Sequence, residues 1–349
     1  MGIDLGELIV KTPLTFEQLS GKSIAIDAYN ALYQFLAIIR GPSGEPLKDR
    51  TGRITSHLSG LLYRSCALMS YGIRLVYVFD GRPPVEKEVE IKRRMKIKEE
   101  AIVKYEEALK VGDFEAARKY AQATATLKDD MVEDAKRLLS YLGIPWIQAP
   151  SEGEAQASYM ASKGHVWAVA SQDHDCLLFG APRLVRNLAV TGRRKLPGRK
   201  LYVELQPELI ELEKVLKANA ITREQLIDIA ILIGTDYNPE GIKGIGPKKG
   251  LKLIKEYGNL KALLDEHVID SLSFLVDPET IKKKFLNPDV TTDYELIWEE
   301  PKVSDVIKFL CYERDFSESR VKNALDQAIK AFREKYRQRR LFNLSVFTF

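Results

Sequence analysis

Short, nearly continuous apolar runs recur along the first half of the chain. They cover residues 22–27, 74–80, 144–149 and 166–171. Such runs are typical of strands that are buried on both faces of a parallel sheet. The segment between the first two runs is longer and carries apolar residues at helical spacing. The pattern therefore predicts an α/β fold in which helices connect and flank a mainly parallel sheet.

Between residues 86 and 107 the pattern changes, because 14 of 22 residues are charged. Pro83 and Pro84 precede this stretch and Gly112 follows it, which marks both of its ends. The remaining apolar residues fit one narrow helical stripe, formed by Ile91, Met95, Ile102, Tyr105 and Leu109. We expect a helix here that buries little of its surface.

From about residue 220 the chain alternates helices with a glycine-rich loop. Thr222 and Gln225 have the spacing of a capping box at the start of a helix, and a second helix is expected to start at Pro247. Glycines and lysines alternate in the loop between them, where backbone N–H groups can approach a phosphate. This segment resembles the helix–hairpin–helix element that holds duplex DNA by its backbone. The alternative is a tight turn between two helices.

The composition limits the classes of function. The 349 residues carry 53 Lys and Arg against 49 Asp and Glu, so the net charge of +4 does not by itself indicate nucleic acid. The spacing of Cys66, Cys176, Cys311 and the four histidines argues against zinc, disulfide and cysteine-nucleophile chemistry. No apolar run approaches the roughly 18 residues of a membrane span, and the amino terminus lacks the features of a signal peptide. We therefore expect a protein inside the cell with no membrane partner.

Positive charge is concentrated in four segments, residues 82–98, 193–200, 243–255 and 333–340. Runs of charge are more often solvated surfaces than binding sites, and we prefer that interpretation for the second and fourth segments. The first segment is part of the charge-rich helix, and the third contains the glycine-rich loop. These two are the candidates for binding phosphate.

Acidic residues follow all four predicted strands. They are Asp27, Asp80, the pair Glu152 and Glu154, and the pair Asp173 and Asp175. One acid after a strand is usually a helix cap or a turn residue, but the carboxyl ends of parallel strands share one edge of a sheet. Carboxylates at this density need cations, and hard oxygen ligands favour Mg²⁺ or Mn²⁺. Two such ions would suit phosphodiester hydrolysis. Glu152 and Glu154 can serve one site only near the start of a helix.

Five motifs in this order resemble those of the flap endonucleases, structure-specific 5′ nucleases of the XPG group. They read IDA from residue 26, VFDGRPP from 78, APSEGEAQA from 149, SQDHDCLLFG from 171 and GTDYNPEGIKGIGPKKG from 234. The match extends from Gly2 to about Leu260. It implies a PIN-like nuclease core with a mixed, mainly parallel sheet, a helical arch and a helix–hairpin–helix element.

The resemblance also implies an organisation of the chain. A single nuclease domain over residues 1–335 would comprise an N-terminal region (1–101), an arch (82–130), an internal region (140–260) with the helix–hairpin–helix element at 222–257, and a helical part (260–335). Residues 336–349 would form a tail. No motif explains the part from 260 to 335.

The family has seven metal-binding carboxylates, which would bind two Mg²⁺ ions, with Mn²⁺ as a substitute. They correspond to Asp27, Asp80, Glu152, Glu154, Asp173, Asp175 and Asp236. Only Asp236, in the loop after a helix, is absent from the set found at strand ends. The resemblance places Lys87 and Arg94 at the scissile phosphate as electrostatic catalysts. Without it, a solvated helix face would be the preferred interpretation for both.

Further positions match DNA contacts of the family. Tyr33 matches an aromatic residue on which an unpaired base stacks, Thr55 matches the pocket for a 3′ flap nucleotide, and Arg40 and Arg64 match contacts to the DNA backbone. The remaining predicted DNA contacts are Gly2, Glu152, Gly234, Asp236, Gly244, Gly246, Lys248 and Lys249. The glycine-rich loop is also a candidate site for a monovalent cation.

The tail resembles the family's motif for binding the sliding clamp, with differences. Gln338, Leu341 and Leu344 are the predicted clamp contacts, but Leu344 and Ser345 occupy the places of two aromatic residues. No lysine-rich extension follows, which is more typical of archaeal members. We therefore expect a cytoplasmic, DNA-associated protein, or a nuclear one if the source is eukaryotic, and a monomer that binds branched DNA with a 5′ flap.

The predicted activity is 5′ flap cleavage together with 5′–3′ exonuclease activity, in Okazaki fragment maturation and DNA repair. A related 5′ exonuclease or a bubble-cutting nuclease would share the metal site, but about 60 residues after Asp80 are too few for the long insertion of the latter. A non-catalytic DNA-binding or clamp-binding scaffold would lack one or more carboxylates. A small PIN-type ribonuclease would not need the arch or the glycine-rich loop.

Overall fold

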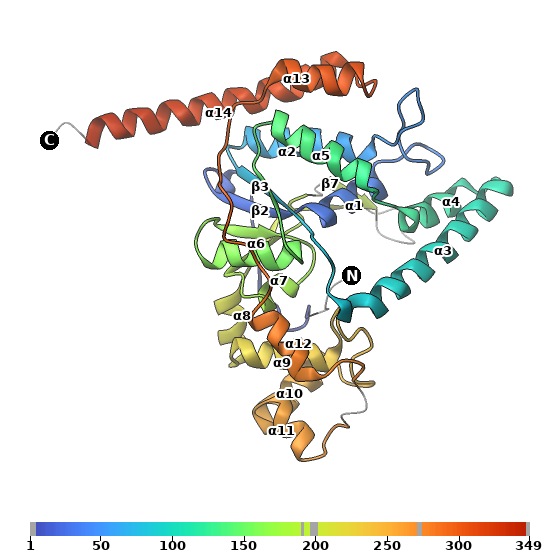
Figure 1. The fold of residues 1–349 in the computed structure, drawn as a ribbon, viewed down its shortest axis with the longest axis vertical. Coiled ribbons are helices and arrows are strands. Elements are labelled where there is room, and N and C mark those ends of the chain that lie inside the picture. Colours follow the sequence, from blue (N-terminus) through green and yellow to red (C-terminus); the bar gives the residue numbers. More distant parts are fainter. Residues whose placement is uncertain (1–4, 190–191, 196–201, 271–273, 347–349) are drawn as a thin grey trace.

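A seven-stranded sheet forms the centre of the computed structural model (Figure 1), which describes residues 5–189, 192–195, 202–270 and 274–346, without the side chains of 192–195, 202–205 and 335–346. The strand order is β1-β9-β6-β5-β2-β3-β4. The strands are β1 (Lys11–Pro13), β2 (Ser23–Asp27), β3 (Arg74–Phe79), β4 (Trp146–Gln148), β5 (Ala168–Ala170), β6 (Arg183–Arg186) and β9 (Glu208–Glu211), and β7 (Gly192–Lys195) pairs with β8 (Tyr202–Leu205) as a separate hairpin. From β6 to β4 all neighbours are parallel, whereas β9 is antiparallel to β6 and β1. The predicted mixed, mainly parallel sheet is confirmed.

Both faces of the central strands are buried, which explains their unbroken apolar sequences. In β2, Ile24 and Ile26 belong to one core cluster, while Ala25 belongs to another on the opposite face. The first cluster is covered by α1, α2 and α5, and the second by α6. The helices around the sheet are α1 (Ala28–Ile38), α2 (Ser56–Ser70), α5 (Asp129–Tyr141), α6 (Gly153–Ser162) and α7 (Asp175–Leu178), with a 3-10 turn, η1 (Glu17–Leu19), before β2.

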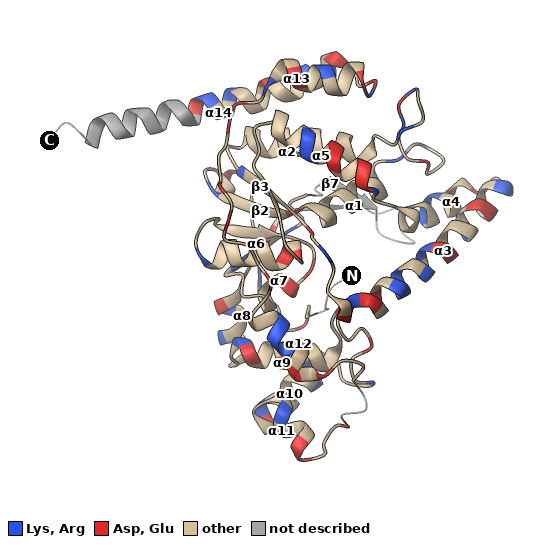
Figure 2. Ribbon diagram, viewed as in Figure 1, with Lys and Arg blue, Asp and Glu red and all other residues tan. Residues whose placement is uncertain are grey.

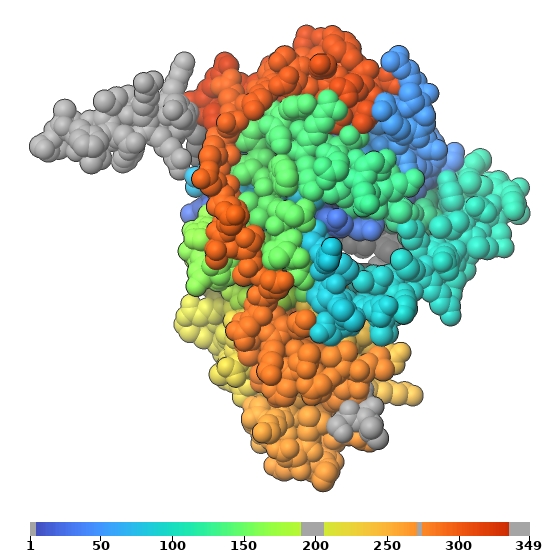
Figure 3. All heavy atoms as spheres, in the orientation of Figure 1, coloured from blue at the N-terminus to red at the C-terminus, as the bar shows by residue number. Residues whose placement is uncertain are grey.

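The charge-rich segment forms an arch that stands out from the sheet (Figures 1 and 2). It comprises η2 (Val85–Lys87), α3 (Glu88–Lys110), α4 (Phe114–Ala121) and η3 (Gln122–Thr124). Only Glu90, Ala101 and Ala108 of α3 are buried, in agreement with the narrow apolar stripe. Gly112, at φ +72°, allows the turn that brings α4 back along α3. Figure 3 shows a small opening between the arch and the central part of the molecule.

A second, mostly helical lobe lies below the sheet in Figure 1. It comprises α8 (Leu212–Asn219), α9 (Arg223–Ile233), α10 (Pro247–Tyr257), α11 (Leu260–Asp265) and α12 (Pro278–Leu286). The predicted capping box is present, since Thr222 and Gln225 each bond the other's backbone N–H, and Pro247 is the first residue of α10. Buried Asp228 accepts from Leu260 N and pairs with Lys282 (2.9 Å), which joins α9 to α11 and α12.

Residues 287–302 form an extended strap that returns from this lobe across the sheet. Gln156 exchanges two hydrogen bonds with the Thr291 backbone, and the Trp298 indole donates to the Leu75 carbonyl (2.7 Å). At Gly143 (φ +65°) an added Cβ would lie 2.2 Å from the Glu299 carbonyl oxygen, so this crossing requires glycine. The strap leads to α13 (Val303–Ile307), a π-helical turn η5 (Lys308–Tyr312) and α14 (Glu318–Val346), which packs on α2.

A helix that crosses a membrane must be both long and apolar. Within the described ranges, no helix is both long enough and apolar enough to cross a bilayer.

Candidate active site

The carboxyl ends of neighbouring strands bring the predicted acids to one edge of the sheet. Asp27 ends β2, Asp80 follows β3, and Asp173 follows β5, and these three strands are adjacent. Asp27 is also the N-cap of α1, where it accepts from Asn30 N (3.0 Å), so the capping role and a ligand role are compatible. Asp175 begins α7 close by.

Glu152 and Glu154 lie at the start of α6, where an i, i+2 pair can face one site. The helix begins at Gly153, and Glu152 is its N-cap residue. Gly153 N donates to Asp80 Oδ1 (2.6 Å), and a Cβ on Gly153 would lie 2.8 Å from that oxygen. Glycine at this position therefore allows the two acidic segments to approach.

Three of the acids, which we call the core acids, are Asp27, Asp80 and Glu154. Burial, together with the negative charges of their neighbours, raises the pKa of Asp27 and of Glu154 well above the usual range. Burial is also the main cause that raises the pKa of Asp80, to about 6. Without a cation beside them, burial therefore disfavours the ionised forms of the core acids.

Two further acids, which we call the arch-paired acids, are Glu152 and Asp236. Lys87 forms ion pairs with both, at 3.3 Å to Asp236 Oδ2, and Arg94 pairs with Asp236 Oδ1 at 2.8 Å. Although burial works in the opposite direction, these cations hold the pKa of Asp236 below its usual value. Burial alone would lower the pKa of Lys87, but the charges of Glu152 and Asp236 outweigh it and raise that pKa. The arch is thus joined electrostatically to the sheet edge.

Tyr237 completes this part of the site and was missed by the sequence reasoning. Its hydroxyl donates to Glu152, and Lys87 Nζ lies 5.1 Å from the centre of its ring. The only sequence signal was its place directly after Asp236. Asn30 and Ser171 were missed as well: the Asn30 amide donates to Asp173 (3.2 Å), and the Ser171 hydroxyl donates to Glu154 (2.6 Å).

The carboxylates at this edge have the chemistry that divalent cations prefer, but within the described ranges they are not already arranged around an ion position. All of these donors are hard carboxylate oxygens, which favour Mg²⁺ or Mn²⁺ over softer metals, and a bound cation would favour the ionised forms of the core acids. In the part of the chain that the structure describes, no three His, Cys, Asp or Glu side chains already enclose an ion position. The residues that could hold metal are the core acids, the arch-paired acids, Asp173 and Asp175.

The predicted DNA contacts around the arch differ in accessibility. Tyr33 is 43% exposed, as a stacking residue requires. Arg40 donates to the Leu36 and Gly44 carbonyls (both 2.9 Å), and Arg64 donates to the Leu188 carbonyl and lies over the Phe16 ring. Thr55 is only 5% exposed and offers little surface to a nucleotide. The assignments of all four to DNA stay predictions.

The glycine-rich loop between α9 and α10 has the open backbone that we expected. Gly244 (φ +83°) and Gly246 have free space where a Cβ would be, whereas a Cβ on Gly234 would lie 2.9 Å from the Pro239 carbonyl oxygen. Lys248 is exposed and pairs with Glu7 (3.1 Å), and Lys249 reaches the Gly244 carbonyl (3.4 Å). These lysines lie at the start of α10, where its dipole also favours anions.

Four predicted contacts cannot be placed. Gly2 lies outside the described residues, and the side chains of Gln338, Leu341 and Leu344 lie outside the described part of α14. Their roles stay predictions.

Comparison with known proteins assigns the family. The XPG N-terminal domain matches residues 1–101 and the XPG I-region matches residues 143–236. Flap endonuclease 1 of Hyperthermus butylicus is 57% identical over 97% of both chains. The structure of flap endonuclease-1 from Methanococcus jannaschii superimposes with a TM-score of 0.75 at 46% identity, over 96% of this chain and all of that one. The catalytic core of Rad2 in complex with DNA substrate gives 0.68 at 25%, over 93% and 98% of the two chains. The chain therefore belongs to the flap endonuclease family of XPG nucleases.

Proposed function

We propose that the chain cuts branched DNA near the junction between a 5′ single-stranded flap and duplex. Members of this family are metal-dependent nucleases that hydrolyse phosphodiester bonds. The observation that carries the proposal is the pairing of Lys87 and Arg94 with the arch-paired acids. This pairing supports the proposal because two cations from the arch lie beside the acidic edge of the sheet, where a scissile phosphate would need them.

Two Mg²⁺ ions, replaceable by Mn²⁺, are the proposed cofactors. The core acids, the arch-paired acids, Asp173 and Asp175 would hold them. When bound, such ions activate water and neutralise charge on the phosphate. Lys87 and Arg94 are permanent cations, so they stabilise negative charge that develops on the phosphate, and Tyr237 holds Glu152 by its hydroxyl.

The DNA is proposed to extend to either side of this centre. The loop between α9 and α10 would hold duplex through phosphate contacts to Gly244, Gly246, Lys248 and Lys249, which carry no sequence preference. The opening between the arch and the sheet would accept the single strand (Figure 3), with Tyr33 as a stacking surface. In the same loop, Asn238 Oδ1 is buried and has no hydrogen-bond partner among the residues that the structure describes, which supports the proposed monovalent cation.

The substrate panel that tests this proposal consists of single-flap, double-flap, nicked and bubble DNA of one sequence, with Mg²⁺. We expect cleavage next to the flap junction, a 5′ phosphate on the product, and slower 5′–3′ exonuclease activity at nicks. Preferential cutting of bubbles, or digestion of blunt ends with no cut at flaps, would contradict the proposal and favour the other nucleases of the group.

The cellular role follows as part of the proposal. Flap removal would serve Okazaki fragment maturation and DNA repair. The protein would act as a monomer that associates with DNA in the cytoplasm. Gln338, Leu341 and Leu344 would contact a sliding clamp. Deleting residues 338–349 should leave unstimulated cleavage intact and remove stimulation by the clamp; stimulation that survives the deletion would locate clamp binding elsewhere.

A further inference from the structure

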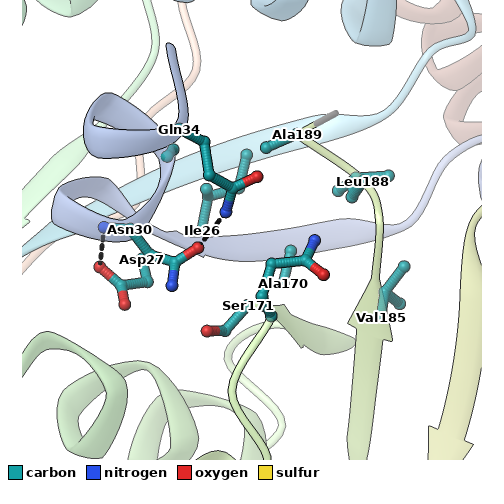
Figure 4. A pocket seen from close by; sticks show the side chains of 11 residues that line it. Ile26, Asp27, Asn30, Gln34, Ala170, Ser171, Val185, Leu188 and Ala189 are labelled. Atoms are coloured by element: carbon teal, nitrogen blue, oxygen red, sulfur yellow. Dashed lines mark hydrogen bonds between the residues drawn. The ribbon is translucent and has the colours of Figure 1, made fainter. Parts of the chain in front are cut away.

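A small polar cavity lies beside the core acids, between α1 and the ends of β2, β5 and β6 (Figure 4). Its volume is about 10 Å³, room for roughly one water molecule, and its polar lining includes Asp27, Asn30, Gln34, Ser171 and Gln172. Apart from Asp27, these side chains are uncharged. The function proposed above does not use them.

Asn30 contacts two carboxylates that come from different strands. Its backbone N–H donates to Asp27 Oδ1 (3.0 Å), and its side-chain Nδ2 donates to Asp173 Oδ2 (3.2 Å). Gln34, one helical turn later, donates from Nε2 to Asn30 Oδ1, as the dashed line in Figure 4 marks. Because Oδ1 of Asn30 accepts from Gln34, the NH₂ group of Asn30 is directed at Asp173.

The hydrogen bonds continue beyond Asp173. Its backbone N–H donates to Ser171 Oγ (3.2 Å), and Ser171 Oγ donates to Glu154 Oε1 (2.6 Å). The chain of contacts from Gln34 to Glu154 therefore connects α1 with α6 through the loop after β5, and it reaches Asp173 and Glu154.

The absence of charge in these donors has a physical reason. Like-charged carboxylates repel one another, so hydrogen-bond donors must hold their oxygens in place before a cation binds. A lysine or arginine would do so, but its charge would compete with the metal for the same oxygens. Neutral amide and hydroxyl donors orient the oxygens without that competition, as is common around metal ligands.

We propose that Asn30 is a positioning residue of the metal site, whose side chain directs Asp173 and is itself oriented by Gln34. The inference rests on the proposed function, because it assumes that Asp173 binds the ions. Asn30 touches this carboxylate and acts on catalysis only through it. Gln34 acts only through Asn30.

Binding of Mn²⁺ to the full-length protein without DNA tests the proposal, with free Mn²⁺ measured by electron paramagnetic resonance. In the Asn30→Leu variant, leucine has almost the same shape as asparagine but no hydrogen-bond donor. We expect the Kd of this variant for Mn²⁺ to be roughly 10- to 100-fold higher than that of the wild type. Gln34→Leu should raise the Kd less, and the double variant should match Asn30→Leu. Gln172→Leu is the matched control, since Gln172 lines the same cavity and makes no hydrogen bond among the described residues.

A second measurement separates positioning from damage to the fold. If Asn30 acts through the metal ligands, flap cleavage by Asn30→Leu should recover as Mg²⁺ is raised, with an unchanged KM for DNA. An unchanged Mn²⁺ affinity of Asn30→Leu, or additive effects of the two substitutions, would overturn the inference. Should Asn30→Leu fail to fold, an unchanged affinity of Gln34→Leu would do the same. If the wild-type chain neither binds Mn²⁺ nor cuts flaps, the proposed function itself fails.

Discussion

The core acids and the arch-paired acids lie at one sheet edge, yet their neighbours are opposite in charge. Burial raises the pKa of Asp27, Asp80 and Glu154, and none of the three forms an ion pair within the described residues. Glu152 and Asp236 form ion pairs with Lys87, and Asp236 also pairs with Arg94. In the proposed function the first group would take its positive charge from metal ions, and the second takes it from the arch.

This division also explains why the arch helix is so polar. Glu90 is one of the few buried residues of α3 and accepts from Arg94 Nε (2.7 Å). Arg94 Nη2 donates to Asp236 Oδ1 (2.8 Å). A helix packed into the core would bury its basic residues at high cost, because isolated buried charges are strongly destabilising. An exposed helix carries the same cations to the site and keeps most of its length hydrated.

The largest expected effect comes from the core acids. Glu154→Gln keeps the shape of the side chain and removes one negative charge, so we expect cleavage to fall by more than the roughly 10- to 100-fold that loss of an orienting residue costs. Flap DNA binding should stay within a few-fold, as measured by fluorescence anisotropy. Mg²⁺-dependent turnover close to wild type would remove Glu154 from the metal site.

Replacing Lys87 of the arch should lower the cleavage rate nearly as much as replacing Glu154, but it should leave DNA binding unchanged. Lys87→Met retains most of the aliphatic length, and we expect single-turnover cleavage to fall on the order of 10²- to 10³-fold, because the developing charge loses a fixed cation. Lys92→Met is the control, since Lys92 is exposed and pairs with Glu88 one turn away on the same helix (3.3 Å). Equal losses in both variants would mean that the arch contributes general charge.

Without metal, substitutions in the two regions should change the melting temperature in opposite directions. In EDTA, Asp80→Asn should raise the melting temperature, because it removes a charge whose burial is unfavourable. Lys87→Met should lower it, by up to about 3 kcal/mol in unfolding free energy, because it removes the cation that Glu152 and Asp236 share. Excess Mg²⁺ should reduce both differences. Shifts of the same sign would contradict the division.

The last prediction concerns the pH dependence of His57, a buried titratable group that forms no ion pair within the described ranges. Burial lowers its pKa to about 4, against the attraction of Asp130 on α5 and with the repulsion of Arg314, and neither ring nitrogen has a hydrogen-bond partner in the part of the chain that the structure describes. The folded protein therefore keeps His57 neutral while the unfolded chain takes up a proton below about pH 6.5. Stability relative to His57→Leu should fall between pH 6.5 and 4, by about 3 kcal/mol in all. A difference that does not vary with pH would show that His57 titrates normally.

The parts of the fold that were predicted are those with a strong local pattern. Strands β2 to β5 were found because both of their faces are apolar, and α9 because Thr222 and Gln225 cap it. The strands β1, β6 and β9 were missed, because three- or four-residue strands with polar ends show no period. The strap was missed for a related reason: residues such as Thr291 and Trp298 bind the sheet from an extended segment without secondary structure.

The site was predictable where an acid follows a strand. Asp236 lies after a helix, so only the family resemblance located it, and Tyr237 was hidden beside it. Asn30 looked like an ordinary residue in the first turn of a helix, because its partner Asp173 is distant in sequence. Contacts of this kind depend on the order of strands in the sheet, which no local pattern specifies.

The packing of α14 on α2 has a consequence for synthesis. These helices come from opposite ends of the chain and share one core cluster, in which Val321 and Leu325 complete the surface around Leu58 and Leu61. A chain still on the ribosome can form the strands and the acidic edge but cannot close this cluster until the strap and the last helix emerge. The nascent protein therefore exposes apolar surface on α2 until translation is nearly finished, and this is the surface that a chaperone would meet first.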